Sequence, residues 1–242
     1  MAFTPVLHAE WLKIRTLRSL IGALVALLAV TTAFSAIAAS GSAPSDPGFD
    51  PLFTAFLGIA PGQIAALAFG ALAVSCELSG GGLRLAFTAV PRRGSWFAAK
   101  LTAVAVPALL VGLVAGAVSL AVARAGMGSA ADGLTAGQQL RGIAGCGLYL
   151  MLMAVFAAGL TALLRSAVGA LSVLVPLLLV VSFVVGDSAG GLPEYLPDRA
   201  GQVVLHARPD GSLGPWTGLA VSALWTAAAV AAGAWSVRRR DA

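Results

Sequence analysis

Charged side chains are scarce in this chain. Asp, Glu, Lys and Arg make up 10% of the 242 residues, whereas 59% are hydrophobic, and the mean hydropathy is +0.92. Soluble domains carry charge on about a quarter of their residues. The composition therefore excludes an ordinary soluble domain and predicts an integral membrane protein. The two cysteines, Cys76 and Cys146, both lie inside apolar runs and lack the spacing of metal ligands.

Six apolar runs are long enough to cross a bilayer as helices, which takes about 20 residues each. They cover residues 19–39, 52–76, 95–123, 142–164, 166–186 and 216–237. Pro61 and Pro107 fall inside the second and third runs, where proline predicts a kink. The predicted fold class is all-α, with six transmembrane helices in a single domain over residues 1–242.

Acidic residues are missing from the middle of every predicted span, and Glu77 and Asp187 at the ends come nearest. Transporters driven by protons or sodium usually need buried carboxylates or broken coordinating helices, so ion coupling is disfavoured. His8 and His206 lie outside the spans and on opposite sides, which leaves no nucleophile beside a histidine within the membrane. We expect no catalytic residue, no bound cofactor and no metal site, and hence not an enzyme.

Lys and Arg divide unequally between the two sides that six spans create. One side, which holds both termini, carries eleven: Lys13, Arg15, Arg18, Arg84, Arg92, Arg93, Lys100, Arg165, Arg238, Arg239 and Arg240. The other side carries four: Arg124, Arg141, Arg199 and Arg208. Because cytoplasmic loops are the basic ones, both termini are predicted to face the cytoplasm in a multi-pass protein of the cell membrane. The net charge of +5 is scattered among short loops, so membrane lipids and not nucleic acid are the expected contacts.

The N-terminal residues predict a helix that lies along the membrane surface before the first span. Apolar residues from Phe3 to Leu17 fall broadly on one side, although Glu10 and Arg18 lie near that side too. Trp11 suits the depth of the lipid headgroups. The candidate functional residues of this interfacial helix are Glu10, Trp11, Lys13, Arg15 and Arg18.

Two polar side chains within the spans need an explanation. Gln63 follows Pro61-Gly62 and requires a hydrogen-bond partner inside the bilayer. It either joins two helices or lines a substrate path. Lys100, near the start of the third span, is expected to extend its ammonium back to the interface.

A polar segment separates the second and third spans. Ser79 can cap a helix, three glycines allow a sharp turn, and Leu83, Phe87 and Val90 recur at helical spacing. A short surface helix is predicted over residues 79–90, ended by Pro91 and followed by the cations Arg92 and Arg93. Leu78-Ser79-Gly80-Gly81 imitates the signature motif of ABC-transporter ATPases, but the phosphate-binding loop that hydrolysis requires is missing from the sequence.

This segment carries a resemblance to a known family. Ser75-Cys76-Glu77-Leu78-Ser79-Gly80-Gly81-Gly82-Leu83-Arg84, with Val90-Pro91-Arg92-Arg93 after it, is similar to the link between spans two and three of actinobacterial ABC type-2 transporter permeases. Residues 10–19, Glu10-Trp11-Leu12-Lys13-Ile14-Arg15-Thr16-Leu17-Arg18-Ser19, and the terminal Arg238-Arg239-Arg240-Asp241-Ala242 also resemble that family. Leu78 stands where an aromatic residue is usual, and Gly82 where threonine is usual.

The resemblance implies the membrane-spanning subunit of an ATP-binding-cassette exporter. Such a chain pairs with a second permease copy, identical or different, and with two cytoplasmic ABC ATPase subunits that bind the ATP. The segment between spans two and three would be the coupling helix that docks on the ATPase. Its candidate residues are Glu77, Ser79, Gly80, Gly81, Gly82, Leu83, Arg84, Phe87, Pro91, Arg92 and Arg93.

Two other classes of function stay open. A non-transporting membrane scaffold or immunity-type subunit would still recruit an ATPase, and an intramembrane enzyme is the less favoured reading. The substrate is not encoded recognisably, because the spans show small and aliphatic side chains with scattered Ser, Thr and Gln. A lipid, a peptide or a hydrophobic drug is compatible with them.

Overall fold

The computed structural model describes residues 3–41, 49–78, 93–178, 193–208 and 211–239. Its elements are helices, and no strand occurs within these ranges. The long helices are α2 (Arg18–Ser40), α4 (Ile59–Leu78), α6 (Arg93–Met127), α7 (Ala136–Leu164) and α11 (Pro215–Arg239). The shorter ones are α1 (Phe3–Thr16), α3 (Pro51–Ala55), η1 (Gly128–Ala131), α8 (Ala167–Pro176), η3 (Pro193–Tyr195), α10 (Pro197–Gln202) and η4 (Val203–Leu205).

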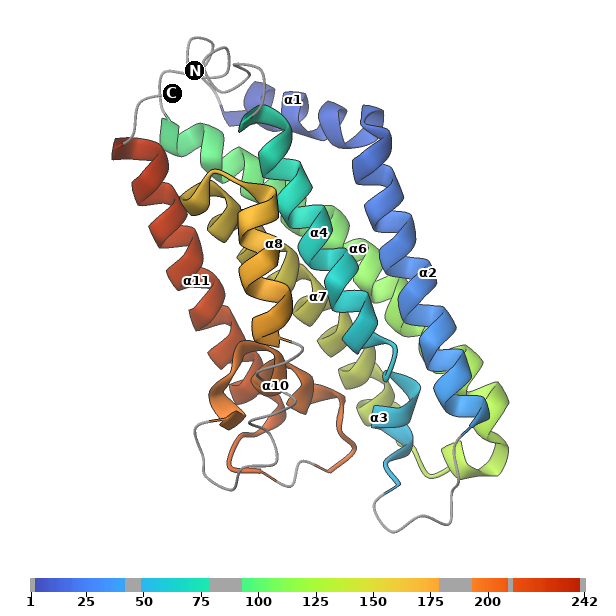
Figure 1. Ribbon diagram of the computed structural model, residues 1–242. Coiled ribbons are helices and arrows are strands. Elements are labelled where there is room, and N and C mark those ends of the chain that lie inside the picture. The colour runs from blue at the N-terminus through green and yellow to red at the C-terminus, as the bar shows by residue number, and fades with distance from the viewer. Residues whose placement is uncertain (1–2, 42–48, 79–92, 179–192, 209–210, 240–242) are drawn as a thin grey trace.

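The long helices form an elongated bundle, with the two ends of the chain at one end of it (Figure 1). We call this the terminal end and the opposite one the far end. Helices α2 and α6 run toward the far end, and α4, α7 and α11 run back; α1 lies across the terminal end, while α3 and α10 lie at the far end (Figure 1). Helix α7 is the central element, since it packs against α4, α6 and α11.

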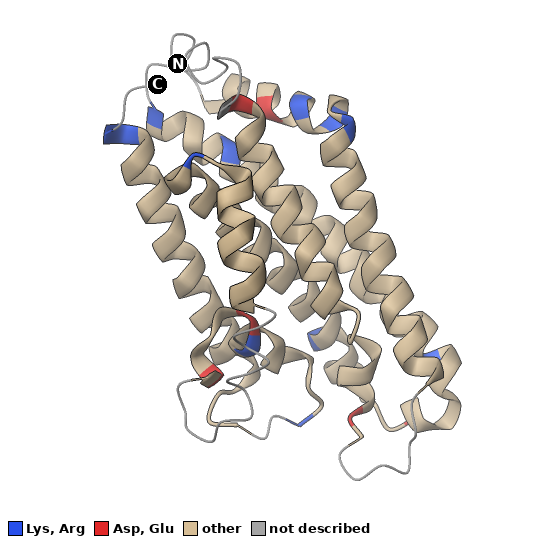
Figure 2. Ribbon diagram, in the orientation of Figure 1, with Lys and Arg blue, Asp and Glu red and all other residues tan. Residues whose placement is uncertain are grey.

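The five long helices are long and apolar enough to cross a membrane. Their outer faces carry exposed aliphatic side chains, among them Ile37 on α2, 64% exposed, and Leu224 on α11, 70% exposed. Within the described residues, Lys, Arg, Asp and Glu gather toward the two ends of the bundle (Figure 2). On α11, the exposed Trp216 and Trp235 mark the two depths at which aromatic side chains meet lipid headgroups. The chain is an all-α membrane protein.

Most of the predicted spans lie close to the helices. The spans expected at residues 19–39 and 216–237 correspond to α2 and α11 within about two residues, the usual uncertainty of helix ends. The third and fourth spans, expected at 95–123 and 142–164, are α6 and α7, each longer toward the far end. Thr135 extends α7 because it caps it in a reciprocal bond with Gln138. Pro107 lies inside α6 without ending it.

The start predicted for the second span, residue 52, is wrong. Residues 52–55 belong to the separate helix α3, which Asp50 caps by accepting hydrogen bonds from Leu52 and Phe53 N–H at 2.9 and 3.0 Å. The chain then turns at Gly58, whose absent side chain lets the backbone approach α2 at Thr31. Pro61 lies in the first turn of α4, where a missing N–H costs little, so the break precedes it.

The fifth span, expected at 166–186, is described only in its first part. Helix α8 covers Ala167–Pro176 and is shorter than a membrane-crossing helix. Residues 179–186 lie outside the described ranges. Helix α7 ends at the terminal end and α11 begins at the far end, and α8 points from the first toward the second (Figure 1).

Small residues allow the central helices to approach one another closely. A Cβ atom on Gly70 of α4 would lie 1.9 Å from the backbone oxygen of Ala154 in α7. A Cβ on Gly159 of α7 would lie 2.8 Å from the backbone of Ala229 in α11. Because lipid is as apolar as the side chains, close packing of this kind is what holds helices together in a membrane.

Candidate functional site

Four charged side chains meet at the terminal end of the bundle. Glu10 and Lys13 come from α1, Glu77 from the last turn of α4, and Lys100 from the second turn of α6. We call these four residues the charge cluster. It joins the helix that lies across the terminal end to the two helices that flank residues 79–92.

In the charge cluster, both lysines form ion pairs with both glutamates. Lys100 Nζ pairs with Glu10 Oε2 and lies 2.5 Å from Glu77 Oε1. Lys13 Nζ lies 2.8 Å from Glu10 Oε1 and 2.5 Å from Glu77 Oε1. Each cation thus contacts both carboxylates, and the four formal charges cancel.

Burial makes these pairs more consequential than surface ion pairs. The side chains of Lys100 and Glu10 are each 3% exposed and that of Glu77 is 7% exposed, whereas Lys13 is 38% exposed. Burial alone would lower the pKa of the Lys13 ammonium, but hydrogen bonds and charge interactions with Glu10 and Glu77 outweigh it and raise that pKa. The cluster therefore stays charged at neutral pH on its accessible side.

The charge cluster contains three of the residues expected from the sequence and one that was expected elsewhere. Glu10, Lys13 and Glu77 were candidates, but Lys100 was expected at the lipid interface. Lys100 does point toward the terminal end, but α1 covers it there and its ammonium pairs with carboxylates. The sequence feature that could have indicated this pairing is the position of Glu10 near the apolar side of α1, because that side packs against the bundle and brings the carboxylate with it.

The other predicted residues of the N-terminal helix lie outside the cluster. Arg15 and Arg18 are exposed, and Trp11 is half-buried. Of the coupling residues, Ser79, Gly80, Gly81, Gly82, Leu83, Arg84, Phe87, Pro91 and Arg92 lie outside the described ranges. The predicted surface helix falls there as well.

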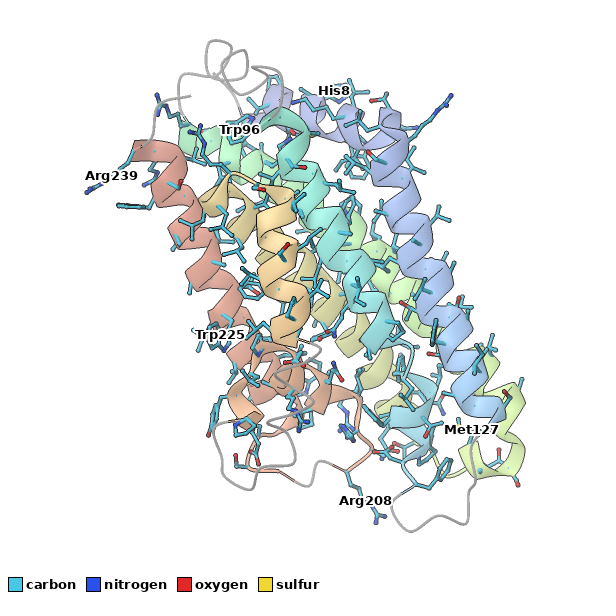
Figure 3. All side chains as sticks on the ribbon, in the orientation of Figure 1. His8, Trp96, Met127, Arg208, Trp225 and Arg239 are labelled. Carbon is cyan, nitrogen blue, oxygen red and sulfur yellow. The ribbon has the colours of Figure 1, made fainter. Side chains whose placement is uncertain are left out.

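Arg93 connects the start of α6 to the end of α11. Its Nη1 donates to the backbone oxygens of Val237 and Arg238, each at 3.4 Å. Arg239 lies at the same end, beside Trp235 (Figure 3). At the terminal end, the charge cluster therefore joins α6 to α1 and α4, and Arg93 joins it to α11.

Gln63 forms part of a second polar group, nearer the far end. The hydroxyl of Tyr149 on α7 donates to Gln63 Oε1, and Gln202 Nε2 of α10 donates to the Tyr149 oxygen at 3.3 Å. Gln63 and Tyr149 are buried. These bonds join α4, α7 and α10, which is the helix-joining role expected of Gln63.

Gln63 also lines a cavity of about 470 Å³. The cavity lies between the start of α4, helix α10 and the residues that follow it, and its lining includes Phe53, Gln202 and His206. One side chain thus both joins helices and lines a cavity. Nothing in the sequence points to Tyr149 or Gln202, which join Gln63 in one chain of hydrogen bonds only through the packing of α4, α7 and α10 in the bundle.

His206 lines one edge of the cavity and is held there by Asp50. His206 Nδ1 lies 3.4 Å from Asp50 Oδ2, and the His206 ring stacks on Phe53 at 4.1 Å between centroids. Burial would raise the pKa of Asp50, but hydrogen bonds from His206 and from the backbone N–H groups of Phe53 and Ala207 lower it overall. Arg141 donates to the backbone oxygen of His206 at 2.5 Å, so the edge is fixed on both sides.

No group of three or more His, Cys, Asp or Glu side chains within the described ranges could hold a metal ion. No protein-family model matches this chain, and no curated protein matches its sequence.

Proposed function

We propose that this chain is the membrane-spanning subunit of an ATP-binding-cassette exporter, driven by separate cytoplasmic ATPase subunits. The observation that supports it best is the charge cluster. Movement of residues 79–92 by a docked ATPase would act directly on the ends of α4 and α6, between which those residues lie. The cluster would transmit that movement to α1, because Lys100 contacts a carboxylate on α1 and another on α4.

The sequence of the connecting segment supplies the second support. Residues 75–93 resemble the corresponding link of ABC type-2 permeases. Glu77, near the start of this link, belongs to the charge cluster. In this proposal residues 79–90 form the coupling helix, Leu83 and Phe87 supply its apolar contact, and α1 lies beside it.

The proposed topology has six spans, with both termini in the cytoplasm of a cell that carries the protein in its cell membrane. Eight Lys and Arg residues of the described ranges belong to the terminal end by the course of the helices and four to the far end, and the basic end is the cytoplasmic one. The fifth of these spans is assigned to α8 and the residues after it, because the chain must return from the end of α7 to the start of α11. A second permease copy completes the transporter.

The proposal is tested by purifying the tagged chain from its source organism in detergent and measuring the ATPase that accompanies it. We expect saturable ATP hydrolysis that belongs to a copurified ATPase subunit and is missing from the chain purified alone. Phe87→Ala should reduce the recovered ATPase at least about fivefold, since an aromatic anchor often contributes more than 1 kcal/mol to an interface.

A matched control removes an aromatic side chain at the far end. Trp216→Ala, at the start of α11, should leave the recovered ATPase unchanged. Equal recovery with Phe87→Ala and with the wild-type chain would contradict the coupling role. If the ATPase is recovered but reconstituted vesicles show no ATP-dependent export of any lipid, peptide or drug tested, the scaffold reading replaces the exporter.

A further inference from the structure

We propose that the cavity at the far end binds a small organic cation that has an apolar body, an N–H donor and a hydrogen-bond acceptor. The proposal rests on the lining of this cavity and not on any partner of the chain. Its volume of about 470 Å³ lies within the range of roughly 300–1,000 Å³ that is usual for small-molecule sites.

The polar atoms of the Gln63–Tyr149–Gln202 group are only partly used by one another. The Tyr149 hydroxyl occupies the carbonyl oxygen of Gln63, which leaves the Gln63 amide N–H groups without a partner among the described residues. Gln63 is 2% exposed and lines the cavity. An amide N–H without a partner at the wall of a cavity favours a ligand that supplies an acceptor.

Gln202, at the other end of this hydrogen-bonded group, has an unused acceptor. Its Nε2 donates to Tyr149, and its carbonyl oxygen makes no hydrogen bond to the described residues. Gln202 also lines the cavity. A ligand that places an acceptor near Gln63 and an N–H donor near Gln202 would satisfy both amides.

The charge of the lining selects a cation. Glu194, Asp198 and Arg199 line the cavity, so its lining holds two carboxylates and one guanidinium. Glu194 Oε2 accepts hydrogen bonds from Ser212 N–H at 3.2 Å and Ser212 Oγ at 2.6 Å. Glu194 Oε1 makes no hydrogen bond to the described residues and is the atom that a ligand's cationic N–H would reach.

The remaining lining fits a flat apolar body. Phe53 is stacked on His206, so one wall is formed by two parallel rings. Ala60, Leu178, Val203 and Leu213 supply aliphatic contacts around it. An apolar wall with a few convergent polar groups is the usual composition of a binding site for an organic molecule.

The test uses the full chain alone, in nanodiscs of neutral phosphatidylcholine and without ATP. Rhodamine 6G is the probe, because it is a flat cation with N–H donors and an ester carbonyl. Its binding is measured by equilibrium dialysis against nanodiscs that lack the protein. We expect saturable binding that is about tenfold weaker in Glu194→Gln, which keeps an acceptor for Ser212 but loses the charge.

Two further variants locate the site. Ala60→Phe fills the cavity from the first turn of α4 and should abolish saturable binding. Asp132→Asn is the matched control, since it removes an exposed carboxylate at the same end of the bundle without touching the cavity. It should bind the dye as the wild-type chain does.

Three results would overturn the proposal: no saturable binding to the wild-type chain, wild-type affinity in both Glu194→Gln and Ala60→Phe, or equal affinity for the neutral dye Nile red. Because the experiment contains no ATPase, its failure leaves the exporter proposal untouched. Failure of ATPase copurification would likewise leave the binding site standing.

Discussion

Replacing Lys100 by methionine would leave the carboxylates of Glu10 and Glu77 buried with a single cation between them. Methionine keeps most of the volume of the lysine stem, so packing against α1 and α4 is little changed and the lost charge dominates the effect. Both carboxylates contact Lys100, and the side chains of all three residues are at most 7% exposed. The variant therefore measures the electrostatic contribution of the cluster to the fold.

The expected size follows from the burial of the partners. Breaking a buried ion pair by removing one member costs about 3–5 kcal/mol, because the remaining charge stays in a poor solvent. Lys13 still lies 2.8 Å from Glu10 and 2.5 Å from Glu77 after the change, so one negative charge keeps a counterion. We expect a loss of about 3 kcal/mol in the free energy of unfolding, at the lower end of that range.

The assay is equilibrium unfolding of the purified chain in mixed micelles with increasing SDS. Lys13→Met should cost about 1 kcal/mol or less, because the Lys13 side chain is 38% exposed and water screens its pairs. Arg124→Met is the control on the same helix, since Arg124 is exposed near the far end of α6 and donates to the amide oxygen of Gln139. It should change the stability by no more than about 0.5 kcal/mol.

The double variant Glu77→Gln/Lys100→Met separates charge from packing. It removes one charge of each sign, so the cluster stays neutral, and it should be less destabilised than the sum of the two single variants by about 1–3 kcal/mol. The reasoning is refuted if Lys100→Met matches the control, or if Lys13→Met is as damaging as Lys100→Met. Strict additivity in the double variant would show that the buried pair of Lys100 and Glu77 contributes no interaction energy.

Three further outcomes are expected. In a cysteine-free background in intact cells, a membrane-impermeant thiol reagent should label a cysteine at Asp132 and not one at Arg239; the reverse pattern would invert the topology. Gly70→Ala should destabilise the bundle by about 1–3 kcal/mol through the clash of α4 with α7, whereas Gly22→Ala, with open space around it, should be neutral or stabilising in the same SDS titration. Asp50→Asn should destabilise the chain above pH 3.8, because the folded pKa of Asp50 lies below that ordinary value; the difference from wild type should vanish as the pH falls through the folded pKa, and a difference that persisted there would contradict the ionic role.

Periodicity and run length located the long helices because a membrane helix must be apolar over its whole length. Periodicity and run length did not predict the helix boundary at residues 52–58, where the apolar run continues but the chain turns. That turn depends on the cap that Asp50 provides and on the close approach of Gly58 to α2, and neither alters the hydropathy of the run. They also failed to extend α7 back to Ala136, since its first turns are polar and are held by the cap at Thr135.

The candidate residues divide in the same way. Glu10, Lys13, Glu77 and Gln63 could be singled out because a charged or amide side chain beside an apolar run needs a partner. Their partners could not be read from the sequence. Lys100 is 23 residues from Glu77, and Tyr149 is 86 residues from Gln63, so only the packing of α4 against α6 and α7 brings each pair together.

The sequence by itself determined that the chain is a helical membrane protein and which ends of its helices are basic, because both depend on side-chain type and order alone. The tertiary structure decided where the remaining polar groups lie. Glu10 is buried because α1 folds across the terminal end onto Lys100. The cavity exists because α10, which packs against α11, leaves a space between itself and the start of α4. Both features arise from segments that lie far apart in the chain, whose contacts depend on helix packing geometry and not on local composition.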